Sequence, residues 1–148
     1  MCSSQRGCHH YARFGSTLLR LVQREYAAQW YRFPQHYFCK GDTLHWLERF
    51  AKQGRLFDAI VLDPPTFSRD AKGRIWRVEK DYAKLVAKAK ACLAPGGWML
   101  CTTNCRKLSP ADFRNMVAQG APGAKLTTSA MTFDFDGEQY LKTVWVDA

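Results

Sequence analysis

Residues 57–69 read Phe57-Asp58-Ala59-Ile60-Val61-Leu62-Asp63-Pro64-Pro65-Thr66-Phe67-Ser68-Arg69. The apolar and β-branched run that ends at Leu62 predicts a buried strand. The two prolines after Asp63 lack backbone donors and fix φ, so they stop the strand there. We therefore expect Asp63 at the carboxyl end of a central strand, where open α/β sheets bind their ligands. On these residues alone, a strand followed by a proline turn with a capping aspartate is the alternative interpretation.

Helices and strands are expected to alternate on both sides of this stretch. Expected helices begin at Ser16, at Thr43, near Glu79 and after Ser109, and expected strands cover residues 37–39, 57–62, 98–102, 125–133 and 140–146. Residues 69–77 are expected to form a polar loop, and Pro95-Gly96-Gly97 is expected to end the third helix. The order predicts an α/β fold with a Rossmann-like, doubly wound, mostly parallel sheet that closes with an antiparallel strand pair.

Composition narrows the class of protein. At 148 residues the chain is expected to be one domain with a proper core, and 47% hydrophobic and 14% aromatic residues argue against disorder. The six cysteines do not have the paired spacing of metal ligands, so no metal site is expected. We expect these cysteines to be reduced thiols. The sequence shows neither a membrane span nor a signal peptide, which predicts a soluble cytoplasmic protein.

Positive charge gathers directly after the Asp63 stretch. The formal net charge is +9, and residues 69–90 hold eight basic side chains against three acidic ones. Arg69, Lys72, Arg74 and Arg77 are candidates for a cationic rim that holds RNA phosphates. For Lys84 and Lys88, a solvated helix face is an equally good interpretation.

These motifs resemble those of class I S-adenosylmethionine (SAM) dependent methyltransferases, and more narrowly the Asp-Pro-Pro-x-Phe branch that methylates large-subunit ribosomal RNA. The resemblance is carried by residues 57–69, 73–82, 93–97, 102–105 and 140–146, in the family's order, and covers residues 16–146. It implies a seven-stranded sheet whose last strand is antiparallel, with SAM as cofactor and ribosomal RNA as partner. The alternative is a catalytically inactive remnant or an RNA-binding module of the same fold.

The first part of the family's cofactor site has no counterpart. The sequence has no Gly-x-Gly-x-x-Gly turn, and we expect no strand followed by an acid before Ser16. We therefore interpret residues 16–148 as a partial methyltransferase domain, truncated at its N-terminal side, and leave residues 1–15 unassigned, as foreign or frame-shifted sequence. The missing strands would leave an open sheet edge, which predicts self-association.

The resemblance also implies roles for single residues. Asp63 with Pro64 and Pro65 would accept a hydrogen bond from the target base, and Phe67 would stack on that base. Phe67 comes one position later than the aromatic of adenine-amine methyltransferases, which favours the ribosomal branch. Asn104 would lie beside Asp63.

Three residues are expected to contact SAM. Asp42 would accept a hydrogen bond from the adenine amino group, Thr43 would offer its backbone amide, and Asp63 is the third contact. A plain helix N-cap is the competing role for Asp42. Cytosine-C5 members place a nucleophilic cysteine where this chain has Asn104, and Cys105 falls one residue late, on the other face of its strand. Trp76, Tyr82 and Lys142 also match the family. Trp76 and Tyr82 are possible substrate clamps, with aromatic packing of that loop onto the sheet as the alternative. Lys142 is a candidate phosphate contact or an ordinary surface lysine.

Overall fold

The computed structural model describes residues 10–12, 24, 37–39, 41–69, 73–129 and 140–147. The chain forms two compact units, Met1–Trp46 and Leu47–Ala148. In the first unit, strands β1 (His10–Ala12) and β2 (Tyr37–Cys39) pair in parallel. Strand β1 was not expected, because three residues are too few for strand alternation to show in the sequence. No acidic residue lies between β1 and Ser16, so the expectation that no strand followed by an acid precedes Ser16 is not contradicted. The boundary expected after Gly15 and nearly all of the helix expected from Ser16 lie outside the described residues.

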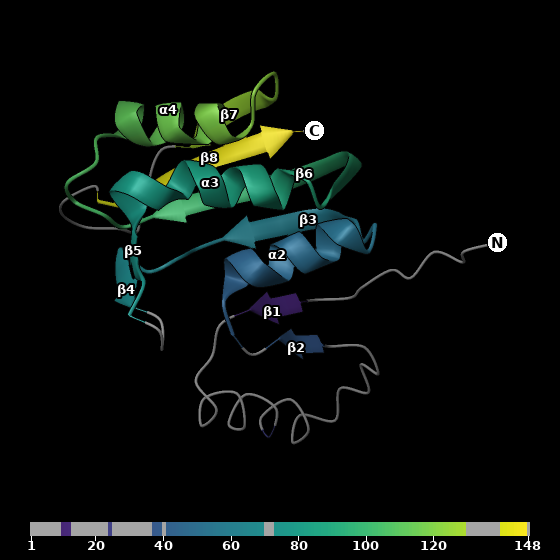
Figure 1. The fold of residues 1–148 in the computed structure, drawn as a ribbon. Coiled ribbons are helices and arrows are strands. Elements are labelled where there is room, and N and C mark those ends of the chain that lie inside the picture. Colours follow the sequence, from purple (N-terminus) through teal and green to yellow (C-terminus); the bar gives the residue numbers. More distant parts are fainter. Residues whose placement is uncertain are drawn as a thin grey trace. The chain divides into compact units, whose positions relative to one another are not determined.

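The second unit contains a four-stranded mixed sheet in the order β3-β6-β8-β7 (Figure 1). Its strands are β3 (Phe57–Leu62), β6 (Leu93–Thr103), β8 (Lys142–Asp147) and β7 (Lys125–Ser129). Strand β3 runs parallel to β6, while β8 runs antiparallel to both β6 and β7. This arrangement confirms the α/β fold and the closing antiparallel pair. The turn expected between the last two strands, residues 134–137, is not among the described residues.

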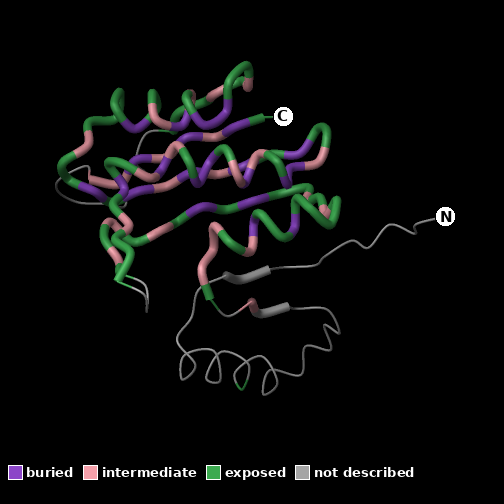
Figure 2. The backbone as a smooth tube through the Cα atoms, in the orientation of Figure 1, coloured by how far each residue is buried: buried purple, intermediate pink, exposed green. Residues whose placement is uncertain are grey.

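Helices α3 (Val78–Lys90) and α4 (Pro110–Gly120) cover one face of this sheet (Figure 1). Figure 2 shows buried residues along both helices and along the strands of the sheet. The rings of Tyr82 and Phe113 meet edge to face with centroids 4.9 Å apart. Gly120 allows the two helices to approach closely, because a Cβ there would lie 2.5 Å from the carbonyl oxygen of Ala83. The predicted cap of α4 is confirmed, since the Asp112 amide donates a 3.0 Å hydrogen bond to the Ser109 hydroxyl.

The opposite face of the sheet carries large side chains from three strands. Trp98 and Leu100 of β6 alternate with fully buried neighbours, and Trp145 of β8 pairs with Leu100 in the register. The rings of Trp98 and Trp145 lie 5.2 Å apart between centroids. Val61 of β3 pairs with Leu100 and is 60% exposed.

Two expected features of the second unit are wrong. The polar loop expected over residues 69–77 is instead a hairpin of β4 (Phe67–Arg69) and β5 (Ile75–Arg77), with Gly73 at φ +79° before β5. Helix α3 ends at Lys90, before the Pro95-Gly96-Gly97 stretch, which lies within β6. That stretch makes an irregularity in which the register shifts between Phe57 and Ala59, and Gly96 adopts φ +75°.

Candidate active site

Asp63 lies at the carboxyl end of the sheet, directly after β3. Leu62 pairs with Cys101 of β6, so Thr102 comes level with Asp63 on the neighbouring strand. The Thr102 hydroxyl donates a 2.7 Å hydrogen bond to Oδ1 of Asp63. Asp63 itself is exposed, so its carboxylate is held at one oxygen and remains open to solvent.

Asn104 lies at the same edge of the sheet. It follows Thr103, the last residue of β6, and is exposed. The hydroxyl of Thr66, three residues after Asp63, donates a 3.1 Å hydrogen bond to Oδ1 of Asn104. The structure therefore brings Asn104 beside the Asp63 loop, as the order of the strands predicts.

A buried phenol ties the ends of the two strands together. Tyr82 of α3 is fully buried, and its hydroxyl lies 3.1 Å from the carbonyl oxygen of Leu62 and 2.9 Å from that of Thr102. Burial raises the pKa of Tyr82 far above the usual phenol range, and the neighbouring Cys101 raises it further. Tyr82 is thus a neutral donor beneath the site. It has the packing role that was the alternative to a substrate clamp, because a fully buried side chain cannot contact a substrate.

The β4–β5 hairpin is attached to the Asp63 loop. The indole nitrogen of Trp76 donates a 3.0 Å hydrogen bond to the carbonyl oxygen of Pro65, and the Val78 amide donates a 3.1 Å bond to Thr66 O. Trp76 therefore fastens the loop, which is the packing role that competes with a substrate clamp. Phe67, 52% exposed, extends from the strand that follows the prolines.

Four exposed side chains share one face of this hairpin. Phe67 pairs with Arg77 and Arg69 pairs with Ile75, so all four lie on the face opposite Ser68 and Trp76. The Arg77 guanidinium carbon lies 5.9 Å from the centre of the Phe67 ring. Arg74 is also exposed, whereas Lys72 lies outside the described residues. Two guanidinium groups thus flank an aromatic and an aliphatic side chain next to Asp63.

Cys105 is turned away from this edge. It is 2% exposed, and its sulfur lies 3.9 Å from Oε1 of Glu79. Asn104 is exposed where Cys105 is buried, which agrees with the change of face expected from a one-residue offset. The alternative of Cys105 as a nucleophile is therefore wrong. Cys92 and Cys101 are fully buried core thiols, as predicted.

Lys142 has neither of its two expected roles. It is 7% exposed, and its ammonium group donates a 3.0 Å hydrogen bond to Cys105 O and a 2.7 Å bond to Tyr140 O. A buried ammonium group requires acceptors, and these two carbonyls supply them. Lys142 therefore supports the backbone after Asn104 and does not reach a phosphate.

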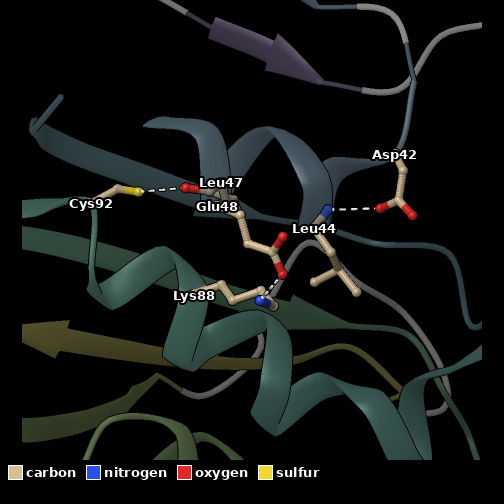
Figure 3. Close-up of polar contacts among 6 residues, drawn as sticks. All are labelled: Asp42, Leu44, Leu47, Glu48, Lys88 and Cys92. Carbon is tan, nitrogen blue, oxygen red and sulfur yellow. Dashed lines mark hydrogen bonds and ion pairs between the residues drawn. The ribbon is translucent and has the colours of Figure 1, made fainter. Parts of the chain in front are cut away.

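Asp42 lies in the first unit and caps helix α2 (Thr43–Lys52), whose residues from Leu47 onward belong to the second unit. Its Oδ1 accepts a 2.8 Å hydrogen bond from the Leu44 amide, as Figure 3 shows. Thr43 is the first residue of the helix, so its backbone amide belongs to the turn whose donors have no acceptor within the helix. The N-cap role of Asp42 is thus confirmed.

Later residues of α2 belong to the second unit and contact α3 and the turn between α3 and β6. Figure 3 shows the ion pair between Glu48 and Lys88 and the 3.3 Å hydrogen bond from the Cys92 thiol to Leu47 O. Lys88 is half-buried and paired with Glu48, whereas Lys84 on the same helix is exposed.

Thr66 and Thr102 are site residues that the sequence analysis did not single out. Each hydroxyl holds one polar side chain of the site, Thr102 holding Asp63 and Thr66 holding Asn104. The available signal was their position, one just after the prolines and the other near the end of the neighbouring strand.

In the described part of the chain, no group of three or more His, Cys, Asp or Glu side chains is placed to hold a metal ion. Nor does any described helix combine the length and apolar character needed to cross a membrane.

No protein-family model matches the chain. Among curated proteins, it is similar to the ribosomal RNA large subunit methyltransferase K/L of Desulfotalea psychrophila, with 27% identity over 131 residues that make up 88% of this chain and 17% of that protein. The protein of the same name from Chromohalobacter salexigens is 39% identical over 103 residues, which cover 69% of this chain and 13% of that protein. The chain thus spans a small part of the length of these relatives.

Among solved structures, a protein assigned as a methyltransferase and complexed with SAH matches with a TM-score of 0.83 and 21% identity. The match covers 94% of this chain and 38% of that one. At this identity the likeness establishes the fold alone.

Proposed function

This chain is homologous to part of the ribosomal RNA large subunit methyltransferases K/L and has the class I methyltransferase fold, and from this premise we propose that it transfers a methyl group from SAM to a base of ribosomal RNA. The observation that carries the proposal is the pair of polar side chains at one sheet edge. Asp63 is held by Thr102, and Asn104 is held by Thr66. A carboxylate and an amide fixed beside an exposed aromatic ring suit recognition of an unstacked base.

SAM, when bound, supplies a methyl group activated by a sulfonium sulfur. We assign the adenine amino group to Asp42, and the backbone amide of Thr43 to the same end of the cofactor. A carboxylate has about four acceptor positions, so capping α2 leaves Asp42 capacity for an amine. Asp63 is the third residue that we assign to the cofactor. Because the sequence has no Gly-x-Gly-x-x-Gly turn, these residues are the part of a SAM site that this chain supplies.

The chain's own residues act by positioning the target base and excluding water. Oδ2 of Asp63 accepts a hydrogen bond from the base. We assign the prolyl oxygen that shares this contact to Pro64, since Pro65 O accepts the bond from Trp76. Phe67 stacks on the base.

The exposed face of the β4–β5 hairpin is the proposed RNA contact. Arg69 and Arg77, with Arg74 and Lys72 nearby in the sequence, neutralise phosphates and release counterions. Replacing Arg69 and Arg77 by Ala should weaken RNA binding and reduce the slope of log K against log salt by about 0.7 per lost contact to a single strand. Arg114→Ala, an exposed arginine on α4, is the matched control. Binding that is unchanged by the hairpin variants would contradict this assignment.

Calorimetric titration with SAM tests the cofactor assignment, and transfer of isotope-labelled methyl groups to ribosomal RNA tests the reaction. Asp42→Ala should abolish SAM binding. Asp63→Ala should abolish transfer, while Asp58→Ala, an exposed aspartate on the same strand, should leave both intact. Absence of SAM binding by the unaltered chain would contradict the proposed function.

A non-catalytic RNA-binding module of the same fold is the second candidate function. It is not favoured, because the curated relatives bear the name of methyltransferases. It predicts RNA binding that depends on salt and on the hairpin arginines, with no methyl transfer at any SAM concentration.

We also propose that copies of the chain associate through β3 and that the protein works in the cytoplasm. Among described residues, β3 pairs only with β6, and Val61 on β3 is 60% exposed. Light scattering after gel filtration should show a mass that rises with concentration, and Val61→Lys should prevent this while Ile75→Lys should not. Thiols without disulfides at Cys92, Cys101 and Cys105 suit a reducing compartment, which cell fractionation can test.

A further inference from the structure

We propose that Thr102 is a positioning residue whose hydroxyl fixes the Asp63 carboxylate, so that Oδ2 is the oxygen presented to the target base. The inference rests on the proposed function, which assigns the base to Asp63. It adds a residue for which neither the sequence motif nor the relatives' names provide a role.

The Thr102 hydroxyl has one proton and two acceptors within reach. Oδ1 of Asp63 lies 2.7 Å away, and the carbonyl oxygen of Leu62 lies 3.4 Å away. A hydrogen bond to a carboxylate is shorter and roughly twice as strong as one to a neutral carbonyl. The proton therefore goes to Asp63.

Thr102 is itself firmly held. Its side chain is β-branched, so its χ1 rotation is restricted. Its backbone carbonyl accepts the 2.9 Å hydrogen bond from the buried Tyr82 hydroxyl, and the same hydroxyl lies 3.1 Å from Leu62 O. Leu62, which precedes Asp63, and Thr102, which holds Asp63, therefore both have their backbone carbonyls next to the same buried hydroxyl group of Tyr82.

An exposed aspartate without such a partner distributes its side chain among staggered rotamers. The bond from Thr102 selects one of them before any base arrives. It also leaves Oδ2 as the acceptor that faces solvent, since Oδ1 is already engaged. Ordering the acceptor in advance removes an entropic cost from the step that aligns the base.

Side-chain rotamers of Asp63 can be measured by NMR in the full chain, through the three-bond couplings of its Cγ to the backbone nitrogen and carbonyl carbon. In the unaltered protein the couplings should report one rotamer. Thr102→Val removes the hydroxyl but keeps the side-chain shape, and should give averaged couplings. Thr102→Ser restores a hydroxyl and should restore the single rotamer.

Thr143→Val is the matched control. Thr143 pairs with Thr102 in the β6–β8 register, and its hydroxyl bonds to Ser129 O and not to the site. It should leave the Asp63 couplings unchanged. Averaged couplings in the unaltered protein, or a Thr102→Val variant that keeps one rotamer, would overturn the proposal.

Single-turnover methyl transfer to RNA provides the functional readout. Thr102→Val should lower the rate roughly ten- to a hundredfold, the factor for losing a hydrogen bond to a charged group, with KM for RNA unchanged. Thr102→Ser should recover most of the rate. Absence of transfer by the unaltered chain would contradict the proposed function, and the couplings would still decide whether Thr102 fixes Asp63.

Discussion

Replacing Tyr82 by Phe should loosen the site from below without opening a cavity. The substitution removes one hydroxyl group and keeps the ring that packs edge to face on Phe113 at 4.9 Å. The hydroxyl is the shared donor for the carbonyl oxygens of Leu62 and Thr102, at 3.1 and 2.9 Å. After the substitution, two strand-end carbonyls beside Asp63 lose this donor at once.

The expected cost follows from the single proton of the hydroxyl. One neutral hydrogen bond contributes about 0.5–1.5 kcal/mol, and leaving a buried acceptor unsatisfied adds to this loss. We therefore expect Tyr82→Phe to lower the free energy of unfolding by about 1–2 kcal/mol, and Tm by about 2–8 °C for a chain of this size.

Urea unfolding measures this change as a lower midpoint with an unchanged m-value. Tyr140→Phe removes the same group from a half-buried tyrosine and is the matched control, expected to stay within about 0.5 kcal/mol of the unaltered protein. Hydrogen exchange should quicken at Leu62 and Thr102 in Tyr82→Phe alone. A Tyr82→Phe variant as stable as the control, with unchanged exchange there, would refute the view that this phenol joins the strand ends.

Three further predictions concern the second unit. Burial raises the pKa of Cys101 to about 12 from 9.0; the unfolded chain therefore loses this proton first, and the contribution of this thiol to stability should be constant below pH 9 and fall by about 1.4 kcal/mol per pH unit from there to pH 12. Cys101→Ala should reduce the slope of stability against pH by that amount in urea titrations across this range, while Tyr82 and Cys92, whose pKa values burial also raises, maintain the rest of the slope. Gly120→Ala would place a Cβ 2.5 Å from Ala83 O and should destabilise the protein by about 1–3 kcal/mol, measured by the urea midpoint. Ser109→Ala removes the acceptor of the 3.0 Å bond from the Asp112 amide and should cost about 1 kcal/mol in thermal unfolding, whereas Ser109→Thr should cost little.

Local chemistry made some elements predictable from the sequence. The run to Leu62 followed by two prolines predicts a strand that stops at Asp63, and β3 ends at Leu62, directly before that residue. Ser109 followed by Pro110 predicted the start of α4 for similar reasons. From two strands that end at one sheet edge, the proximity of Asp63 and Asn104 also followed.

The hairpin of β4 and β5 was not predictable in the same way. Each strand has three residues, and the polar residues around Gly73 resemble an ordinary loop. The contact that attaches the hairpin is the bond from Trp76 to Pro65, eleven residues away in sequence. No local pattern encodes such a bond, because it exists only once the strands are in place.

The burial of Lys142 follows from the alternation of residues along β8, although a lysine is not expected on a buried face. Residues 142, 144 and 146 of β8 share one face of the strand, and Val144 and Val146 are buried against the helices. The period of two therefore places Lys142 on the buried face, although a lysine is seldom buried. Burial is tolerated here because the chain bends back so that the carbonyls of Cys105 and Tyr140 both accept from the ammonium group. Since Cys105 follows Asn104, a lysine expected either to contact an RNA phosphate or to lie on the surface instead holds the backbone next to the site amide.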